Sequence, residues 1–215
     1  MSMNKRVVFG CQGSNRSGML TKINDHFFPD KEDVEQAYIY LKGEISVQSC
    51  AEAIESILTI NYPSFEEDKE GFKVECEYPD VINLFITSTG GDMSGAFALI
   101  NVIRGSRIPV RTISLGEAAS AGLCILMSGH QRVATPYSNL MSHSFSSGAE
   151  GTFHDLINAA EAFKSFHEKM LEFYVECTGL DVEFVKKNLL AERDHYFSPD
   201  KALEYNMVDI VQTLE

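Results

Sequence analysis

The chain has 215 residues and a mass of 24.0 kDa, which is enough for one well-buried domain. Hydrophobic residues make up 44% of the sequence and charged residues 23%, a composition that excludes a mostly disordered chain. The formal net charge of −13 disfavours binding to nucleic acid or to an anionic membrane surface, because such a surface repels phosphate groups.

Cysteine spacing and hydropathy predict a cytoplasmic protein. The five cysteines are widely spaced and contain no C-x-x-C pair, so we expect neither a disulfide framework nor a zinc site. No apolar run reaches the roughly 18–20 residues of a membrane span. The N-terminal residues show no apolar secretory segment followed by a cleavage site.

The first third of the chain divides into an arm, a strand, a helix and an acidic excursion. Residues 1–35 are polar and predict an N-terminal arm that is flexible or faces a pore or partner, whereas residues 36–215 predict a single domain. The segment Tyr38–Ile45 has the pattern of a strand, and Gly43 within it marks the expected end of that strand. A capped helix follows from Ser46. The acidic excursion, residues 61–80, has room for a short hairpin.

Two strand-helix cycles follow and indicate an α/β fold with parallel strands. Val81–Ser88 is a nearly continuous apolar run, typical of a strand buried on both faces, and it breaks at two glycines before a helix. Residues 110–116 predict the next strand, and residues 120–129 a short buried helix. Repeated cycles of this kind favour βαβ units with right-handed crossovers.

One long helix dominates the C-terminal third. It is predicted for Thr152–Thr178, where Gly179 supplies a stop signal, and the whole protruding segment spans about residues 144–178. Its apolar residues are spread widely around the helix, so we expect it to pack against another subunit. The shorter predicted elements are strands at 131–135, 139–145 and 208–212 and helices that begin at Asp181 and Ser198.

Glycines cluster at two strand-to-helix junctions, Ser88–Gly91 and Gly116–Gly122. In a parallel α/β sheet such junctions lie at the carboxyl ends of the strands, where ligands bind. Glycine also serves simple tight turns, so each junction alone is more simply explained as a packing turn. Neither matches a P-loop or a full dinucleotide fingerprint.

Three side chains are candidates for nucleophilic catalysis, and each has a plainer interpretation. Ser120 opens a predicted helix and could be an N-cap, His143 lies in a predicted strand and could be structural, and Asp194 could be a solvated or capping carboxylate. Their order, serine then histidine then aspartate, is compatible with a triad, but triads are defined by geometry and not by sequence order. The histidines lack metal-ligand spacing, so no metal site is expected.

Four segments resemble motifs of the Clp protease proteolytic subunit. GEAASAG resembles its G-x-A-A-S-M-G nucleophile motif, and ITSTGG its I-N-S-P-G-G turn. PYSNLMSHS resembles P-N-S-x-x-M-x-H, and AERDHYFSPDKALEYNMVD resembles E-R-D-x-x-x-S-x-x-E-A-x-x-Y-G-x-x-D. Order and approximate spacing agree from about Tyr38 to the end of the chain. The resemblance implies the repeated ββα superhelix shared with the crotonases, with a protruding handle helix.

The resemblance also implies a serine endopeptidase. Ser120 would be the nucleophile, His143 the general base and then general acid, and Asp194 the carboxylate that orients the imidazole. The oxyanion donors would be the backbone N–H groups of Gly91 and Ala121. No cofactor or metal is expected in this chain, because ATP is used by a partner unfoldase and this sequence has no Walker motif.

The same resemblance predicts assembly and partners. The handle would join two stacked heptameric rings into a chamber that admits only unfolded polypeptides, delivered by an ATP-driven Clp-type unfoldase. The usual aromatic docking pocket is divergent, since Phe85 fits one position whereas Asn83 and Gly105 stand at two others. Residues 1–35 also differ from the family's N-terminal segment.

Two other functions stay open at this point. The chain could be a catalytically silent ring subunit that assembles with an active paralogue, although it keeps Ser120, His143 and Asp194. It could also be a crotonase-type acyl-CoA enzyme, which shares the superhelix and an oxyanion hole but does not need such a triad. Retention on immobilised CoA would distinguish the last of these.

Overall fold

The computed structural model describes residues 36–62, 65–67, 71–75 and 78–214, so the predicted arm, residues 1–35, lies outside the described residues. The described strands are β1 (Gln36–Ile45), β2 (Phe65–Glu67), β3 (Lys73–Glu75), β4 (Val81–Gly91), β5 (Val110–Ala119), β6 (Gln131–Ala134), β7 (Asn139–Ser142), β8 (His195–Phe197) and β9 (Ile210–Val211). The described helices are α1 (Val47–Asn61), α2 (Met93–Gly105), α3 (Ala121–Met127), α4 (Phe153–Thr178), α5 (Val182–Asn188) and α6 (Pro199–Glu204).

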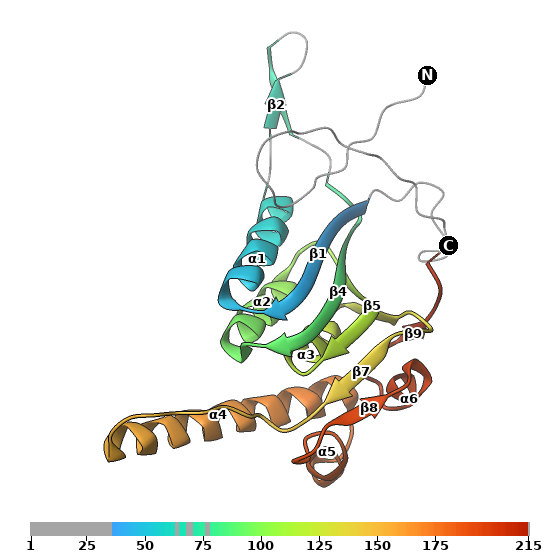
Figure 1. Cartoon of the computed structure of the whole chain (residues 1–215). Helices are drawn as coiled ribbons and strands as arrows, with labels where there is room; N and C mark the ends of the chain where they lie inside the picture. The colour runs from blue at the N-terminus through green and yellow to red at the C-terminus, as the bar shows by residue number, and fades with distance from the viewer. Residues whose placement is uncertain (1–35, 63–64, 68–70, 76–77, 215) are drawn as a thin grey trace.

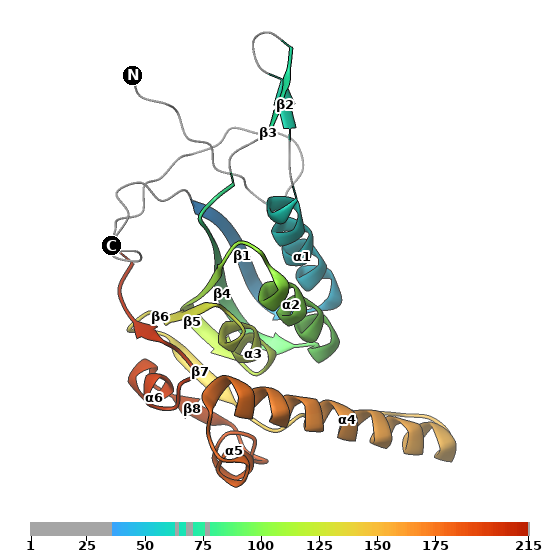
Figure 2. The ribbon, with the colours of Figure 1, turned by 180° about the vertical axis from the view of Figure 1, so that it is seen from behind.

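A mainly parallel sheet forms the centre of the molecule, as the strand-helix cycles predict. Its strands follow the order β1-β4-β5-β6-β9, and β7 pairs parallel to β5 and antiparallel to β8. Figure 2 shows α1, α2 and α3 side by side over one face of this sheet. Ile82, Leu84 and Ile86 of β4 are fully buried in the core. The chain therefore has the α/β fold expected from its sequence.

The opposite face of the sheet carries a second, smaller apolar cluster. Phe85, Ile113 and Val133 are buried there. Tyr38 and Tyr40 stack on Phe85 with ring centroids 6.1 and 5.1 Å away, and Tyr40 is 61% exposed. This face thus presents aromatic rings to its surroundings.

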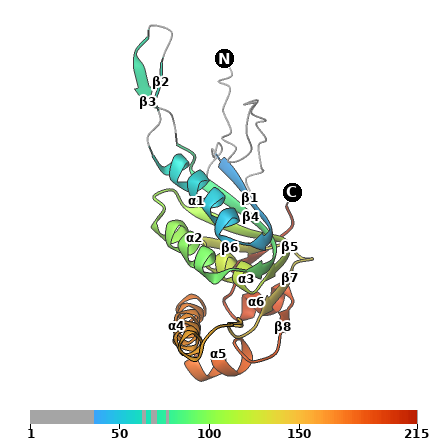
Figure 3. The ribbon, with the colours of Figure 1, turned by 60° about the vertical axis from the view of Figure 1, so that its left-hand side comes forward.

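The long helix α4 extends well past the sheet in Figure 1, and Figure 3 views it nearly along its axis. Its 26 residues span about 39 Å at about 1.5 Å per residue. A capping box between Thr152 and Asp155 fixes its start, and Gly179 ends it with φ 67°. Its fully buried residues lie in the second half, whereas Phe153 near the start is 73% exposed. Within the part of the chain that the structure describes, apolar side chains at the start of α4 are therefore exposed.

Three strands around the glycines end later than the sequence suggests. Strand β1 continues past Gly43, because φ 80° at this glycine and a register shift allow it to keep pairing with β4. Strand β4 includes Gly90 and Gly91, which still pair with β1. Strand β5 runs to Ala119 instead of ending at residue 116. Backbone pairing outweighs the turn preference of glycine at these positions.

Two predictions in the second half need correction. Strand β7 ends at Ser142, so His143 follows the strand instead of lying within it. Strand β8 was not predicted, since a three-residue strand has too little periodicity to detect.

The predicted hairpin in the acidic excursion is confirmed, because β2 and β3 pair antiparallel. No helix among the described residues is long and apolar enough to span a membrane.

Candidate functional site

Ser120 stands in the tight connection between β5 and α3. Its backbone has φ 53° and ψ −120°, a conformation that costs a non-glycine residue about 1–3 kcal/mol. Its backbone N–H donates to the carbonyl of Met141 at 2.8 Å, which ties the connection to β7. Ser120 occupies the N-cap position, but its side chain makes no capping hydrogen bond. The interpretation of this hydroxyl as a helix cap is therefore wrong.

The hydroxyl of Ser120 instead faces the imidazole of His143. The distance between Ser120 Oγ and His143 Nε2 is 2.7 Å, within hydrogen-bond range. Parallel pairing of β5 with β7, in which Ala119 lies opposite Met141, brings the ends of the two strands together. The His143 side chain is 22% exposed, so the pair is partly shielded but accessible.

Asp194 lies on the far side of His143. Its Oδ1 is 3.8 Å from His143 Nδ1, which is longer than a hydrogen bond, and its side chain is 54% exposed. Strand β8 begins at the next residue, His195, which pairs with Ser142. This antiparallel pairing places Asp194 beside His143, although the two are 51 positions apart in the sequence.

The glycine turn of β4 packs directly against Ser120. Gly90 and Gly91 have φ values of 101° and 143°, which side chains rarely allow. A methyl group on Gly90 would lie 2.7 Å from Cβ of Ser120, and one on Gly91 would lie 2.2 Å from the carbonyl oxygen of Ile45. These positions therefore require glycine both for backbone conformation and for space.

The two predicted oxyanion donors belong to elements that flank Ser120. Gly91 ends β4, and Ala121 is the first residue of α3, where a backbone N–H has no partner within its own helix. A methyl group on Gly90 would lie 3.3 Å from the nitrogen of Ala121, so the two elements touch at this point. The turn and the helix start thus surround the serine from two sides.

Ser88 was not singled out from the sequence, although it contacts the glycine turn. Its Oγ accepts a hydrogen bond from the backbone N–H of Gly90 at 3.0 Å, and the residue is 2% exposed. A serine hydroxyl can hydrogen-bond to the backbone two residues on, as in an ST turn. The S-x-G spacing of Ser88 and Gly90 is the signal that could have identified it.

Thiols near this site are poorly suited to act as nucleophiles. Cys124 is fully buried one turn after Ser120, and burial raises the pKa of its thiol to about 12. Burial likewise raises the pKa of Cys177. Among the described residues there is also no cluster of three metal-ligating side chains. The chemistry available at this site is that of a hydroxyl beside an imidazole.

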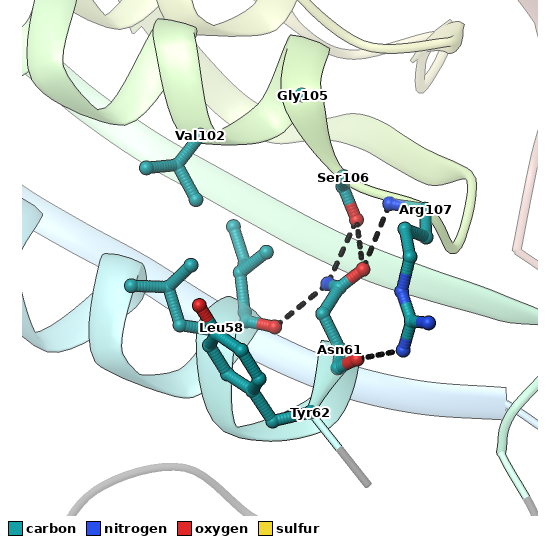
Figure 4. A pocket seen from close by; sticks show the side chains of 8 residues that line it. Leu58, Asn61, Tyr62, Val102, Gly105, Ser106 and Arg107 are labelled. Atoms are coloured by element: carbon teal, nitrogen blue, oxygen red, sulfur yellow. Dashed lines mark hydrogen bonds between the residues drawn. The ribbon is translucent and has the colours of Figure 1, made fainter.

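A separate pocket of about 490 Å³ lies between the C-terminal ends of α1 and α2 (Figure 4). Leu58, Tyr62 and Val102 give it apolar walls, and Gly105 lines it without a side chain. Asn61 closes one end, where its carboxamide oxygen accepts from the backbone N–H of Arg107 at 2.8 Å. This hydrogen bond joins the end of α1 to the segment that follows α2.

The three predicted docking positions fall on two faces of the molecule. Gly105 lines the pocket between α1 and α2. Phe85 belongs to the aromatic cluster on the face of the sheet opposite the helices. Asn83 is 1% exposed and donates to the side chain of Gln36 at 2.9 Å. One subunit therefore does not bring the three positions into a single pocket.

Most of the sequence matches a known protein family. The model of the family described as Clp protease matches residues 34–215, which include Ser120, His143, Asp194 and the glycine turn. The match covers most of the chain and every strand and helix described above. The chain belongs to the Clp protease family.

Proposed function

We propose that this chain is a serine endopeptidase subunit in which Ser120 attacks the peptide bond. The observation that carries the proposal is the 2.7 Å distance between Ser120 Oγ and His143 Nε2. A serine hydroxyl is unreactive at neutral pH unless a neighbouring base accepts its proton, and the imidazole occupies that position. Membership of the Clp protease family supports peptidase chemistry.

The proposed reaction uses each neighbour of Ser120 in turn. His143 takes the proton from the hydroxyl as Oγ attacks the carbonyl carbon of the substrate. The negative oxygen of the tetrahedral intermediate is stabilised by the backbone N–H groups of Gly91 and Ala121. His143 then protonates the leaving amine. In the second half of the reaction His143 takes a proton from water as the water oxygen attacks the acyl carbon, and it returns the proton to Ser120 Oγ as the carboxylic acid leaves. Asp194 stabilises the charged imidazole electrostatically.

The assembly we propose is two stacked heptameric rings that enclose the active sites. Two surfaces support self-association: the first half of α4, where Phe153, Leu156 and Ile157 are exposed, and the aromatic face of the sheet around Tyr40. Both present apolar side chains that are exposed among the described residues of one subunit, as expected of subunit interfaces. Such a chamber would admit only unfolded polypeptides.

A Clp-type ATP-driven unfoldase is the partner we propose for substrate delivery. The pocket between α1 and α2 offers an apolar surface for such a partner, with Leu58 and Tyr62 exposed at its edge. Asn83 and Gly105 lack the aromatic rings expected at these positions, so docking is proposed to rely on other contacts. The chain itself would need no cofactor, since the partner consumes the ATP.

Peptide hydrolysis by the purified protein tests the proposal. Wild type, Ser120→Ala and His143→Ala are compared on a fluorogenic peptide after their oligomeric state has been checked by light scattering. We expect hydrolysis by wild type and losses of at least about 10³-fold in both variants. Equal rates for wild type and Ser120→Ala, at matched assembly, would reject Ser120 as the nucleophile.

A catalytically silent subunit is the second candidate, and the position of Asp194 favours it. At 3.8 Å and 54% exposure, this carboxylate does not hydrogen-bond to His143. A silent subunit would hydrolyse no peptide alone and would change the rate of an active paralogue on mixing. Mixing experiments with an active Clp peptidase subunit distinguish the two candidates.

A further inference from the structure

Ser88 lies where the two elements of the proposed oxyanion hole meet. It is a buried residue near the end of β4, and its β5 partner in the sheet is Ala118, two positions before Ser120. None of the proposed catalytic steps uses its hydroxyl. Its surroundings nevertheless connect it to both predicted donors.

The first connection runs to the glycine turn. The N–H of Gly90 donates to Ser88 Oγ at 3.0 Å, within a buried environment. Gly90 pairs with Glu44 of β1 at φ 101°, and the hydroxyl of Ser88 supplies the hydrogen-bond partner for its N–H. The peptide bond that follows contains the N–H of Gly91. The hydroxyl of Ser88 therefore limits rotation of the segment that carries the first donor.

The second connection runs to the start of α3. A methyl group on Gly122 would lie 3.2 Å from Cβ of Ser88 and 3.5 Å from its Oγ. Gly122 directly follows Ala121, whose N–H is the second predicted donor. The small side chain of Ser88 thus also sets how closely α3 approaches β4.

We propose that Ser88 is a positioning residue that holds the N–H groups of Gly91 and Ala121 at the spacing needed to bind the oxyanion. This role rests on the proposed peptidase function. Oxyanion donors act only when they are already aimed at the position of the negative oxygen, so loss of the Ser88 contact lowers transition-state binding more than substrate binding.

Ser88→Ala removes the acceptor and keeps the small volume against Gly122. We expect kcat to fall about 10-fold with KM within twofold of wild type. The affinity of a peptide boronate, which forms a tetrahedral adduct with Ser120, falls by a similar factor, whereas binding of an uncleavable peptide is unchanged. Ser56→Ala is the matched control, since Ser56 is 5% exposed and donates to the carbonyl of Glu52 at 2.9 Å within α1, on the helix-covered side of the sheet.

Ser88→Cys provides a second variant with a weaker acceptor of similar shape. Its kcat is expected between those of wild type and Ser88→Ala, and it carries the test alone if Ser88→Ala does not fold. The role is refuted by a kcat for Ser88→Ala within twofold of wild type. It is equally refuted if boronate and uncleavable peptide lose affinity together, or if Ser88→Cys is no better than Ser88→Ala. Failure of wild type to react with a fluorophosphonate at Ser120 would instead reject the peptidase function.

Discussion

Replacement of Asp194 by asparagine tests how much an exposed carboxylate contributes to this triad. At the 3.8 Å between Asp194 Oδ1 and His143 Nδ1, the interaction of two unit charges is worth about 1 kcal/mol in water and about 4 kcal/mol at an effective dielectric constant of about 20. The Asp194 side chain is 54% exposed, so solvent screening keeps the value near the lower limit. We therefore take the interaction between Asp194 and the charged imidazole as about 1–2 kcal/mol.

That energy predicts a 5- to 30-fold decrease, roughly, in kcat/KM for Asp194→Asn. A buried, hydrogen-bonded triad aspartate is worth about 10⁴-fold in a well-studied serine protease. The assay is hydrolysis of a fluorogenic peptide under pseudo-first-order conditions, with His143→Ala as the reference for loss of the base. Raising the salt concentration should decrease the wild-type rate toward that of Asp194→Asn, because the interaction is screened.

A loss above about 10³-fold for Asp194→Asn would refute this reasoning, because it would require a hydrogen bond between Asp194 and His143 in the working enzyme. A loss below twofold would also refute it, because Asp194 would then contribute nothing to the charged imidazole. Light scattering on the same samples separates either result from a change in assembly.

Two substitutions and one reagent test the glycine turn, the backbone of Ser120 and the buried cysteines. Gly91→Ala should lower the free energy of unfolding by about 2–4 kcal/mol in urea titrations at fixed protein concentration, because the added methyl group would lie 2.2 Å from a carbonyl oxygen of β1. Gly105→Ala is the control, since its methyl group would meet no described atom within 4 Å and should not destabilise the protein. Ser120→Gly should be more stable than Ser120→Ala by about 1 kcal/mol, since only glycine adopts φ 53° without strain, and equal urea midpoints would contradict this. Iodoacetamide at pH 8 should leave Cys50 and Cys124 unmodified in the native protein, because burial raises their pKa values to about 11 and about 12 and the thiols stay protonated; rapid modification mapped to either cysteine would show that its helix opens.

The parallel sheet could be predicted from sequence because its strands are long apolar runs separated by capped helices. Val81–Ser88 is such a run, and Asp92 caps the next helix through a 2.6 Å bond to the N–H of Gly95. Strand ends at glycines were predicted too early. The turn preference of Gly43 and of Gly90 is a local property, whereas pairing with a neighbouring strand depends on residues distant in the sequence.

The candidate site could be predicted only through its resemblance to a family. Local patterns correctly place Ser120 at the start of a helix, but its hydroxyl makes no capping hydrogen bond, and His143 lies just after its predicted strand. The 2.7 Å approach of the two side chains depends on the pairing of β5 with β7. The 3.8 Å distance between His143 Nδ1 and Asp194 Oδ1 could not be predicted from the sequence. It depends on β8, a strand of only three residues.

Reaction of Ser120 with a fluorophosphonate probe is the most direct test of the proposed peptidase. The assembled protein is incubated with the probe at neutral pH, digested, and the modified residue is identified by mass spectrometry, with Ser120→Ala and His143→Ala treated in parallel. The proposed function predicts one adduct on Ser120 that is absent from Ser120→Ala and formed far more slowly by His143→Ala. An assembled wild-type protein without an adduct at Ser120, or equal reaction rates for wild type and His143→Ala, would contradict it.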